Sequence, residues 1–168
     1  MKSTLGISRR SSRVTERTLS RRHALLMFGT AAMVACDRAG AAGEPWTADR
    51  VMATDDLAKR LPKGPATGPL ILHVGPAVLF RKGHIPGSVH AGEGGDPEGL
   101  NAIADYAKPT PHDREIVVYC GCCPWDHCPN IRPTYSRLTS LGFTNVHVLD
   151  LPKTLQANWI DKGLPLET

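Results

Sequence analysis

The sequence has few aromatic residues and no long apolar run. Phe, Trp and Tyr make up 5% of its 168 residues, so a folded core must be mostly aliphatic. The longest uncharged apolar stretch, Ala24–Ala35, is shorter than the roughly 20 residues that a membrane-spanning helix requires. There is no internal repeat and no dinucleotide-binding glycine pattern, because Gly92-Glu93-Gly94-Gly95 follows no long strand and is predicted to be a loop. A hydrophobic content of 41% nevertheless excludes wholesale disorder.

The folded body also lacks excess positive charge. The net charge is +4, but residues 1–35 alone carry +6 and the remaining 133 residues carry −2. A nucleic-acid-binding surface needs clustered cations that release counterions on binding. We therefore expect no nucleic-acid partner.

The basic charge belongs to an N-terminal segment that is typical of an export signal. Ser20-Arg21-Arg22-His23 precedes the uncharged stretch Ala24–Ala35. Paired arginines directly before a short apolar segment resemble a twin-arginine signal. Residues 1–35 are therefore predicted to direct export, which places the mature protein in the periplasm or on the outer face of the inner membrane.

Two endings of this signal remain open. Met33-Val34-Ala35-Cys36 resembles a lipobox, which would lipidate Cys36 and attach the chain to the inner membrane. Ala39-Gly40-Ala41 alternatively offers an ordinary cleavage site, which would remove Cys36. Residues 36–50 are predicted to be a linker to a single domain at 51–168.

The body alternates short apolar runs with amphipathic segments. This pattern is typical of an α/β domain whose parallel sheet is covered on both faces. The expected strands are Leu70–Val74, Ser88–His90, Glu115–Tyr119 and Val146–Leu149. The expected helices are Thr54–Leu61, Ala77–Lys82, Pro97–Ala107, Arg132–Leu141 and Pro152–Lys162, and residues 120–131 are expected to form a loop.

That loop contains most of the reactive chemistry of the chain. Four of the five cysteines lie within nine residues, and Cys120 directly follows the predicted strand Glu115–Tyr119. Ligands of open α/β sheets bind at the carboxyl ends of strands, where loop amides and a helix N-terminus attract anions. The same environment favours a thiolate, and therefore a nucleophile. Arg132, near the start of the following helix, is a candidate to hold an oxyanion.

Three segments together resemble the rhodanese family, over roughly Leu57 to Leu166. Gly83-His84-Ile85-Pro86-Gly87-Ser88 resembles the family's turn, and Val117–Cys120 is similar to the strand that delivers the active cysteine. A third group of residues is similar to the family's closing strand and helix. It comprises Leu141–Val146, Leu149-Asp150, Trp159 and Gly163–Pro165. The resemblance implies a doubly wound, mainly parallel five-stranded sheet with helices on both faces.

The resemblance also implies sulfur transfer. Cys120 would attack the outer sulfur of a donor such as thiosulfate, become a persulfide, and pass the sulfur to a thiol or to cyanide. The substrate-binding residues would be Gly121, Cys122, Cys123 and Arg132. We expect a small sulfur-containing anion or thiol as partner, and we assign no cofactor and no metal ligand. No protein partner is predicted.

The sequence departs from the family in two places. The family's Asp-Val-Arg triplet after the first long strand is replaced by His73-Val74-Gly75, and Arg132 lies twelve residues after Cys120 in an unusually long loop.

The additional cysteines keep other interpretations open. A disulfide or redox couple would use Cys122, Cys123 and Cys128, for example as Cys122–Cys128 or Cys123–Cys128. A copper or zinc site would draw on the same three thiols and His127. The alternatives to a sulfurtransferase are therefore a thiol-redox or soft-metal-handling protein and a non-catalytic binding module.

Overall fold

The computed structural model describes residues 43–63 and 67–168. The predicted export signal, Cys36 and the first part of the predicted linker lie outside these residues. Export and lipidation therefore stay predictions.

The strands form one five-stranded sheet in the order β1-β5-β4-β2-β3, and every neighbouring pair is parallel. This confirms the expected fold class. The bounds are Val51–Met52 for β1, Leu70–His73 for β2, Ser88–His90 for β3, Ile116–Tyr119 for β4 and Val146–Leu149 for β5. Sequence reasoning located four of these strands but missed β1, because two residues are too few to show an alternating pattern.

The helices also fall close to their predicted places. Their bounds are Thr54–Lys59 for α1, Ala77–Lys82 for α2, Pro97–Ala107 for α3 and Ile131–Ser140 for α4. Short helical turns are η1 (Ala48–Arg50), η2 (Trp125–His127) and η3 (Gln156–Ile160). The predicted final helix, Pro152–Lys162, is thus reduced to the π-helical turn η3.

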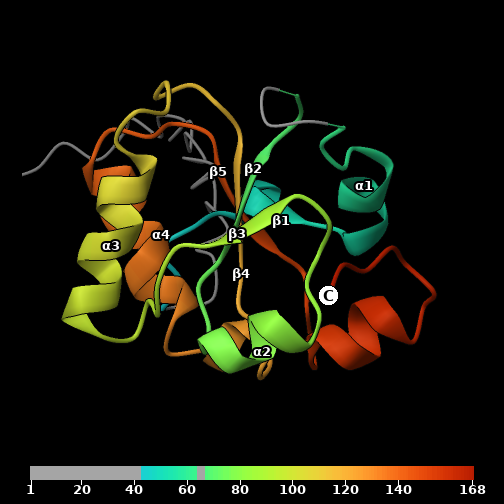
Figure 1. Ribbon diagram of the computed structural model, residues 1–168. Helices are drawn as coiled ribbons and strands as arrows, with labels where there is room; N and C mark the ends of the chain where they lie inside the picture. Colours follow the sequence, from blue (N-terminus) through green and yellow to red (C-terminus); the bar gives the residue numbers. More distant parts are fainter. Residues whose placement is uncertain (1–42, 64–66) are drawn as a thin grey trace, which may run out of the picture. The chain divides into compact units, whose positions relative to one another are not determined.

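Alternate residues of the strands belong to two separate hydrophobic cores, one on each face of the sheet. Leu72 and Val118 point to the face covered by α3 and α4, whereas Ile71 and Val117 point to the face covered by α1 and η3. Figure 1 shows α3 and α4 on one side of the sheet and α1 on the other. The central strand β4 is fully buried along its whole length, as expected for a strand covered on both faces.

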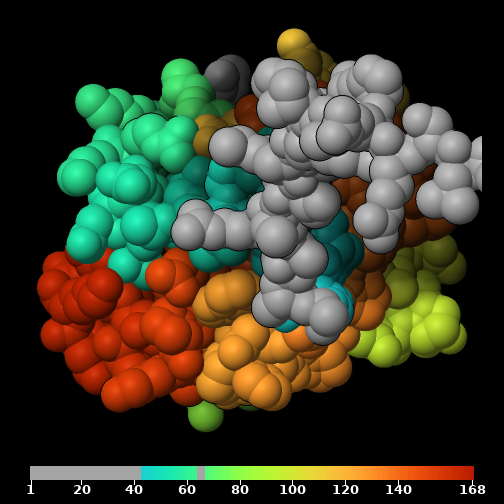
Figure 2. Space-filling model, turned by 180° about the vertical axis from the view of Figure 1, so that it is seen from behind, coloured from blue at the N-terminus to red at the C-terminus, as the bar shows by residue number. Residues whose placement is uncertain are grey.

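The C-terminal segment completes the second face. Trp159 of η3 is fully buried, and its indole Nε1 donates a hydrogen bond to the carbonyl of Pro165 at 2.6 Å. Lys162 Nζ donates to Thr54 Oγ1 at the start of α1 at 3.0 Å. Figure 2 shows this segment, in red, beside the residues of α1.

The sheet order creates a switch point between β2 and β4. From β2 the chain passes through α2 to β3 on one side, whereas from β4 it passes through α4 to β5 on the other. The loops that leave the carboxyl ends of these two adjacent strands therefore diverge, which opens a crevice for a ligand. His73 ends β2, and Cys120 directly follows β4.

Residues 44–50, which the sequence assigned to the linker, pack against the domain. Trp46 is buried, and its ring lies 5.2 Å from that of Tyr135 on α4 and 5.7 Å from that of Trp125 (centroid distances). Glu44 pairs with Arg132. The large apolar surface of the Trp46 side chain accounts for this packing, because its removal from water stabilises the folded segment.

No helix among residues 43–63 and 67–168 has both the length and the apolar character needed to cross a bilayer.

The packing of Trp46 predicts that the segment before β1 stabilises the domain. Trp46→Ala is expected to lower the free energy of unfolding by about 3 kcal/mol, because it removes a buried aromatic ring. Urea unfolding measures the change. Tyr106→Ala is the matched control, because this α3 side chain is 43% exposed, and it should cost no more than about 1 kcal/mol. Equal losses for the two variants would show that residues 44–50 do behave as a linker.

Candidate active site at the thiol cluster

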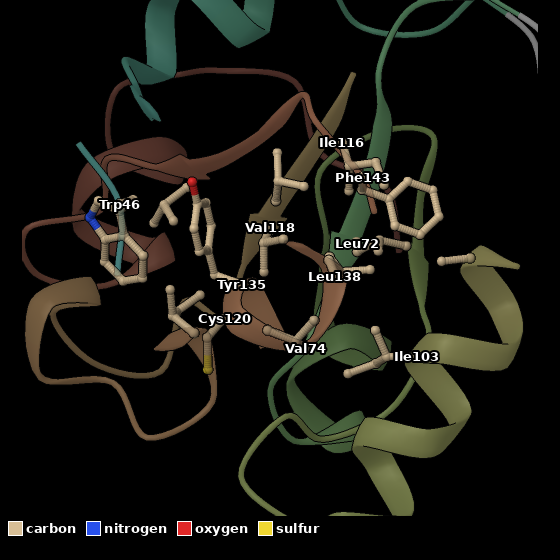
Figure 3. Close-up of a cluster of buried hydrophobic side chains, with 14 of the residues drawn as sticks. Trp46, Leu72, Val74, Ile103, Ile116, Val118, Cys120, Tyr135, Leu138 and Phe143 are labelled. Atoms are coloured by element: carbon tan, nitrogen blue, oxygen red, sulfur yellow. The ribbon is translucent and has the colours of Figure 1, made fainter. Parts of the chain in front are cut away.

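Cys120 occupies the first position after β4, at the end of the buried strand. Figure 3 shows it beyond Val118, at the edge of the hydrophobic cluster that includes Tyr135 and Trp46. Gly121 follows with φ +80°, a conformation that glycine adopts without strain, and a β-carbon there would lie 2.7 Å from Leu155 Cβ. The chain can therefore turn sharply after Cys120 and still pack against the segment before η3.

A cavity of about 370 Å³ opens at this turn. Its walls come from the end of β2, from α2, from the cysteine loop and from the segment around η3. The lining residues are His73, Leu79, Lys82, Gly83, Cys120, Gly121, Cys122, Thr154, Leu155, Gln156 and Ile160. Another hollow of about 500 Å³, lined in part by Pro62 and Tyr106, contains no cysteine among its lining residues. The smaller cavity is therefore the candidate site.

The loop brings three thiols together. The Sγ atoms of Cys120, Cys122 and Cys128 all lie within 4.8 Å of one another, with 3.1 Å between Cys120 and Cys122. Cys120 and Cys128 are buried, and Cys122 is exposed. All four cysteines that the structure describes are free thiols, so the loop disulfide considered from the sequence is not formed in it.

The thiol cluster differs from the ligand set considered from the sequence. His127 is 81% exposed and pairs with Asp126 at 2.8 Å, so its imidazole is directed to a surface carboxylate. Cys123 lies 3.4 Å from Cys122, sulfur to sulfur, but it is not part of the three-thiol group. Sequence spacing could not decide this, because the turn at η2 determines which side chains point inward.

Asn130 is a site residue that sequence reasoning missed. Its side-chain amide is buried and donates to Cys120 Sγ at 3.4 Å. The glycine loop after β3 packs against it: a β-carbon at Gly95 would lie 2.7 Å from Asn130 Oδ1, and one at Gly94 would overlap the Asn130 carbonyl. Gly94 and Gly95 are thus required for the close approach of this loop to the start of α4. This packing role accounts for these two glycines of Gly92-Glu93-Gly94-Gly95, which matches no nucleotide-binding pattern.

The surroundings of Cys120 and Cys128 shift their pKa values in opposite directions. A hydrogen bond from the Cys120 thiol and the backbone N–H groups of Asn130 and Ile131 lower the pKa of Cys128 to about 5, despite burial. The same contact with Cys128, followed by burial, raises the pKa of Cys120. The negative charge of the pair therefore resides on Cys128, beside the N-terminus of α4, and the thiolate expected at Cys120 from the sequence is found on its neighbour.

Gly75 makes room for the Cys120 thiol. A β-carbon at this position would lie 2.5 Å from Cys120 Sγ and 3.3 Å from His73 Nε2. Gly75, the last residue of the triplet His73-Val74-Gly75, thus leaves space that any side chain would take from the sulfur.

His73 contributes an uncharged wall to the cavity. Burial, reinforced by the neighbouring His90, lowers the pKa of His73 to about 4. Its Nδ1 lies 3.1 Å from Nδ1 of His90. The imidazole is therefore neutral near pH 7 and supplies no charge for an anionic ligand.

The structure brings Gly121 and Cys122 to the cavity but not Arg132 or Cys123. The Arg132 guanidinium instead pairs with Glu44 and donates to the carbonyl of Asp126. Lys82, the last residue of α2, is the cation that does line the cavity. It was missed because α2 is distant in sequence from the cysteines. A role for Arg132 or Cys123 in binding substrate stays a prediction that these contacts do not favour.

Several contacts hold the long loop in place. The Trp125 indole donates to Asp150 Oδ1 at 3.0 Å, and the Trp125 backbone N–H donates to the carbonyl of Leu151 at 3.2 Å. At the opposite side of β4, Tyr119 Oη accepts from the backbone N–H of Ile85 at 3.3 Å and contacts Ser88 Oγ at 2.9 Å. The turn Gly83–Ser88 is therefore tied directly to the strand that positions Cys120.

Comparison with known proteins assigns the family. Residues 53–151 match the description "Rhodanese-like domain", which covers more than half of the chain. The chain therefore belongs to the rhodanese-like domain family, as its motifs suggested. No curated protein matches it.

Solved structures of rhodanese-like domains from the Anabaena sp. protein Alr3790 are similar to this chain. A solution NMR structure is 24% identical, covering 70% of this chain and 78% of that one, with a TM-score of 0.49. An X-ray structure of the rhodanese-like domain is 24% identical, covering 68% and 97%, with a TM-score of 0.46.

The close contact at Gly75 predicts an energetic coupling with Cys120. Gly75→Ala is expected to destabilise the domain by about 1–3 kcal/mol, because the new methyl group overpacks the Cys120 sulfur. In a Cys120→Ala background the same change should cost at least about 1 kcal/mol less, because the overlapping sulfur is gone. Urea unfolding of the four proteins measures this. An identical cost in both backgrounds would contradict the contact.

Proposed function

We propose that the domain is a sulfurtransferase in which Cys120 accepts a sulfane sulfur, forms a persulfide, and passes the sulfur to a thiol or to cyanide. Membership in the rhodanese-like domain family is compatible with this activity. The observation that carries the proposal is the position of Cys120: it follows the central strand at the switch point and lines the cavity there.

The surroundings of Cys120 support this role. Gly75 leaves space beside its sulfur, and the buried Asn130 amide donates to it. The backbone N–H of Cys122 also donates toward Cys120 Sγ. These two donors can stabilise negative charge on Sγ itself, which is the charge of the thiolate that attacks the donor and of the thiolate that is released when the acceptor takes the sulfur.

The proposed first half-reaction needs only Cys120, thiosulfate and a proton acceptor. A bond forms between Cys120 Sγ and the outer sulfur of thiosulfate, and the sulfur–sulfur bond of thiosulfate breaks. The electron pair of that bond leaves with sulfite, and the thiol proton passes to the neighbouring Cys128 thiolate. In the second half-reaction the acceptor attacks the outer sulfur of the persulfide and releases Cys120.

Mass spectrometry of the reduced protein tests the proposal. After incubation with thiosulfate, the peptide that contains Cys120 should gain the mass of one sulfur atom, and cyanide should remove it as thiocyanate. Cys120→Ser should abolish both the gain and the turnover, because the alcohol is a far weaker nucleophile. Undiminished turnover by Cys120→Ser would overturn the assignment.

Lys82 is expected to attract the anionic donor. Lys82→Gln should raise KM for thiosulfate about three- to fivefold with little change in kcat, because the exposed amine contributes to binding rather than to the chemical step. The difference should shrink at high salt. Arg81→Gln is the matched control: Arg81 is exposed on the same helix but does not line the cavity. An equal effect of both changes would indicate a general surface-charge effect.

We also propose that the domain works outside the cytoplasm, at the outer face of the inner membrane or in the periplasm. The support comes from the sequence alone: the Arg21-Arg22 pair, the uncharged stretch Ala24–Ala35 and the lipobox-like residues before Cys36.

A further inference from the structure

The cysteine loop contains more thiols than sulfur transfer needs. A persulfide carrier needs one nucleophilic cysteine, yet the Sγ atoms of Cys122 and Cys128 lie within 4.8 Å of Cys120 Sγ and of each other. Three elements of the chain contribute to this arrangement: the end of β4, the turn after it, and the residues just before α4. A separate chemical use of the cluster would account for these two additional thiols.

The geometry suits a metal ion bound by three thiolates. An ion in a trigonal plane with metal–sulfur bonds of about 2.3 Å holds its three sulfurs roughly 4 Å apart. Here Cys120 Sγ and Cys122 Sγ are 3.1 Å apart, and the three Sγ atoms all lie within 4.8 Å of one another. Cys122 is exposed, so a rotation of its side chain can widen its 3.1 Å distance to Cys120 toward this spacing.

The donor set selects a soft ion. Within the described residues, no carboxylate and no imidazole joins the three thiols as a ligand. His127 and Asp126 pair with each other on the surface, and the buried His73 ring contacts His90. Hard cations such as Mg²⁺ and Ca²⁺ require oxygen ligands. Thiolates favour both Cu(I) and Zn²⁺, but structural Zn²⁺ sites take four ligands, so a group of three thiols fits Cu(I) better.

The surroundings complete the requirements of such a site. The Asn130 side-chain amide donates to Cys120 Sγ, and the backbone N–H groups of Asn130 and Ile131 lie against Cys128. Such outer contacts orient ligands and offset the charge of several thiolates. Cys120 and Cys122 both line the cavity, which gives an ion a path to the cluster.

We infer that Cys120, Cys122 and Cys128 form a three-coordinate Cu(I) site, which shares its first ligand with the proposed sulfur-transfer reaction. Cys120 cannot serve as a nucleophile while its sulfur is bound to copper. Copper binding and persulfide formation therefore exclude each other. The site itself does not depend on the proposed function, because the three thiols can bind copper whether or not the domain transfers sulfur.

Anaerobic titration of the reduced protein with Cu(I), in competition with the chromogenic chelator bathocuproine disulfonate, tests the site. One ion per chain should bind, and X-ray absorption should show a first shell of three sulfurs. Cys128→Ser should weaken binding by more than the roughly 10–100-fold that the loss of an outer contact costs. Cys123→Ser is the matched control, because this thiol lies in the same loop but outside the group, and its affinity should match the wild type.

Two further variants keep the test decisive. Cys123 lies 3.4 Å from Cys122, sulfur to sulfur, and can replace it as a ligand, so Cys122→Ser is also made together with Cys123→Ser. The double variant should lose affinity as Cys128→Ser does, and it alters no fully buried side chain. Unaltered affinity in Cys128→Ser and the double variant would overturn the site. Preferential binding of Zn²⁺ over Cu(I) would also overturn it.

A separate readout distinguishes this inference from the proposed function. Stoichiometric Cu(I) should block sulfur uptake by Cys120 from thiosulfate, and removal of the copper by chelator should restore it. A protein that binds copper but takes up no sulfur, with or without the chelator, supports the site and contradicts the sulfurtransferase. A protein that takes up sulfur equally well at one bound copper per chain contradicts the shared ligand.

Discussion

The site depends on the complete burial of β4 between two layers of helices. Its four residues alternate between the two cores, and each of them is fully buried. A strand buried in this way has no freedom to shift its register, because a slip of one residue would exchange the side chains of its two faces. The first residue beyond the strand is therefore held as firmly as the strand itself, and that residue is Cys120.

The neighbours of β4 then decide what surrounds the thiol. Because β2 pairs with β4 through His73 and Tyr119, the chain after β2 must leave the sheet beside Cys120. Gly75 occurs at this point, where a larger residue would overlap the sulfur. On the other side, the glycine loop approaches α4 so closely that Asn130 is held against Cys120. The close approach at Gly75, the close approach of the glycine loop and the position of the Asn130 amide thus all result from where the chain leaves the sheet beside Cys120.

The sequence predicted the sheet better than the site. Short, mostly apolar runs mark β2, β4 and β5, because the sheet is covered on both faces. The position of Cys120 follows from the end of the clearest run, that of β4. The partners of Cys120 were less accessible. Arg132 was the evident cation by its proximity in sequence, but α4 directs it toward Glu44. Lys82 reaches the site from the end of α2 and Gly75 from the segment after β2, and a contact between elements distant in sequence leaves no local pattern.

The cysteine loop is longer than the binding of an anion requires. A loop that only cradles an anion can be short, because a few successive amides suffice. Here the loop continues through η2, is anchored by Trp125 to Asp150, and returns Cys128 to within 4.8 Å of Cys120. Ordering these residues costs conformational entropy. A chain that positions a second buried thiol at this cost gains little as a simple persulfide carrier. It gains a great deal if the second thiol accepts a proton from the first or binds a metal ion with it. The same anchored turn thus supports both uses of Cys120.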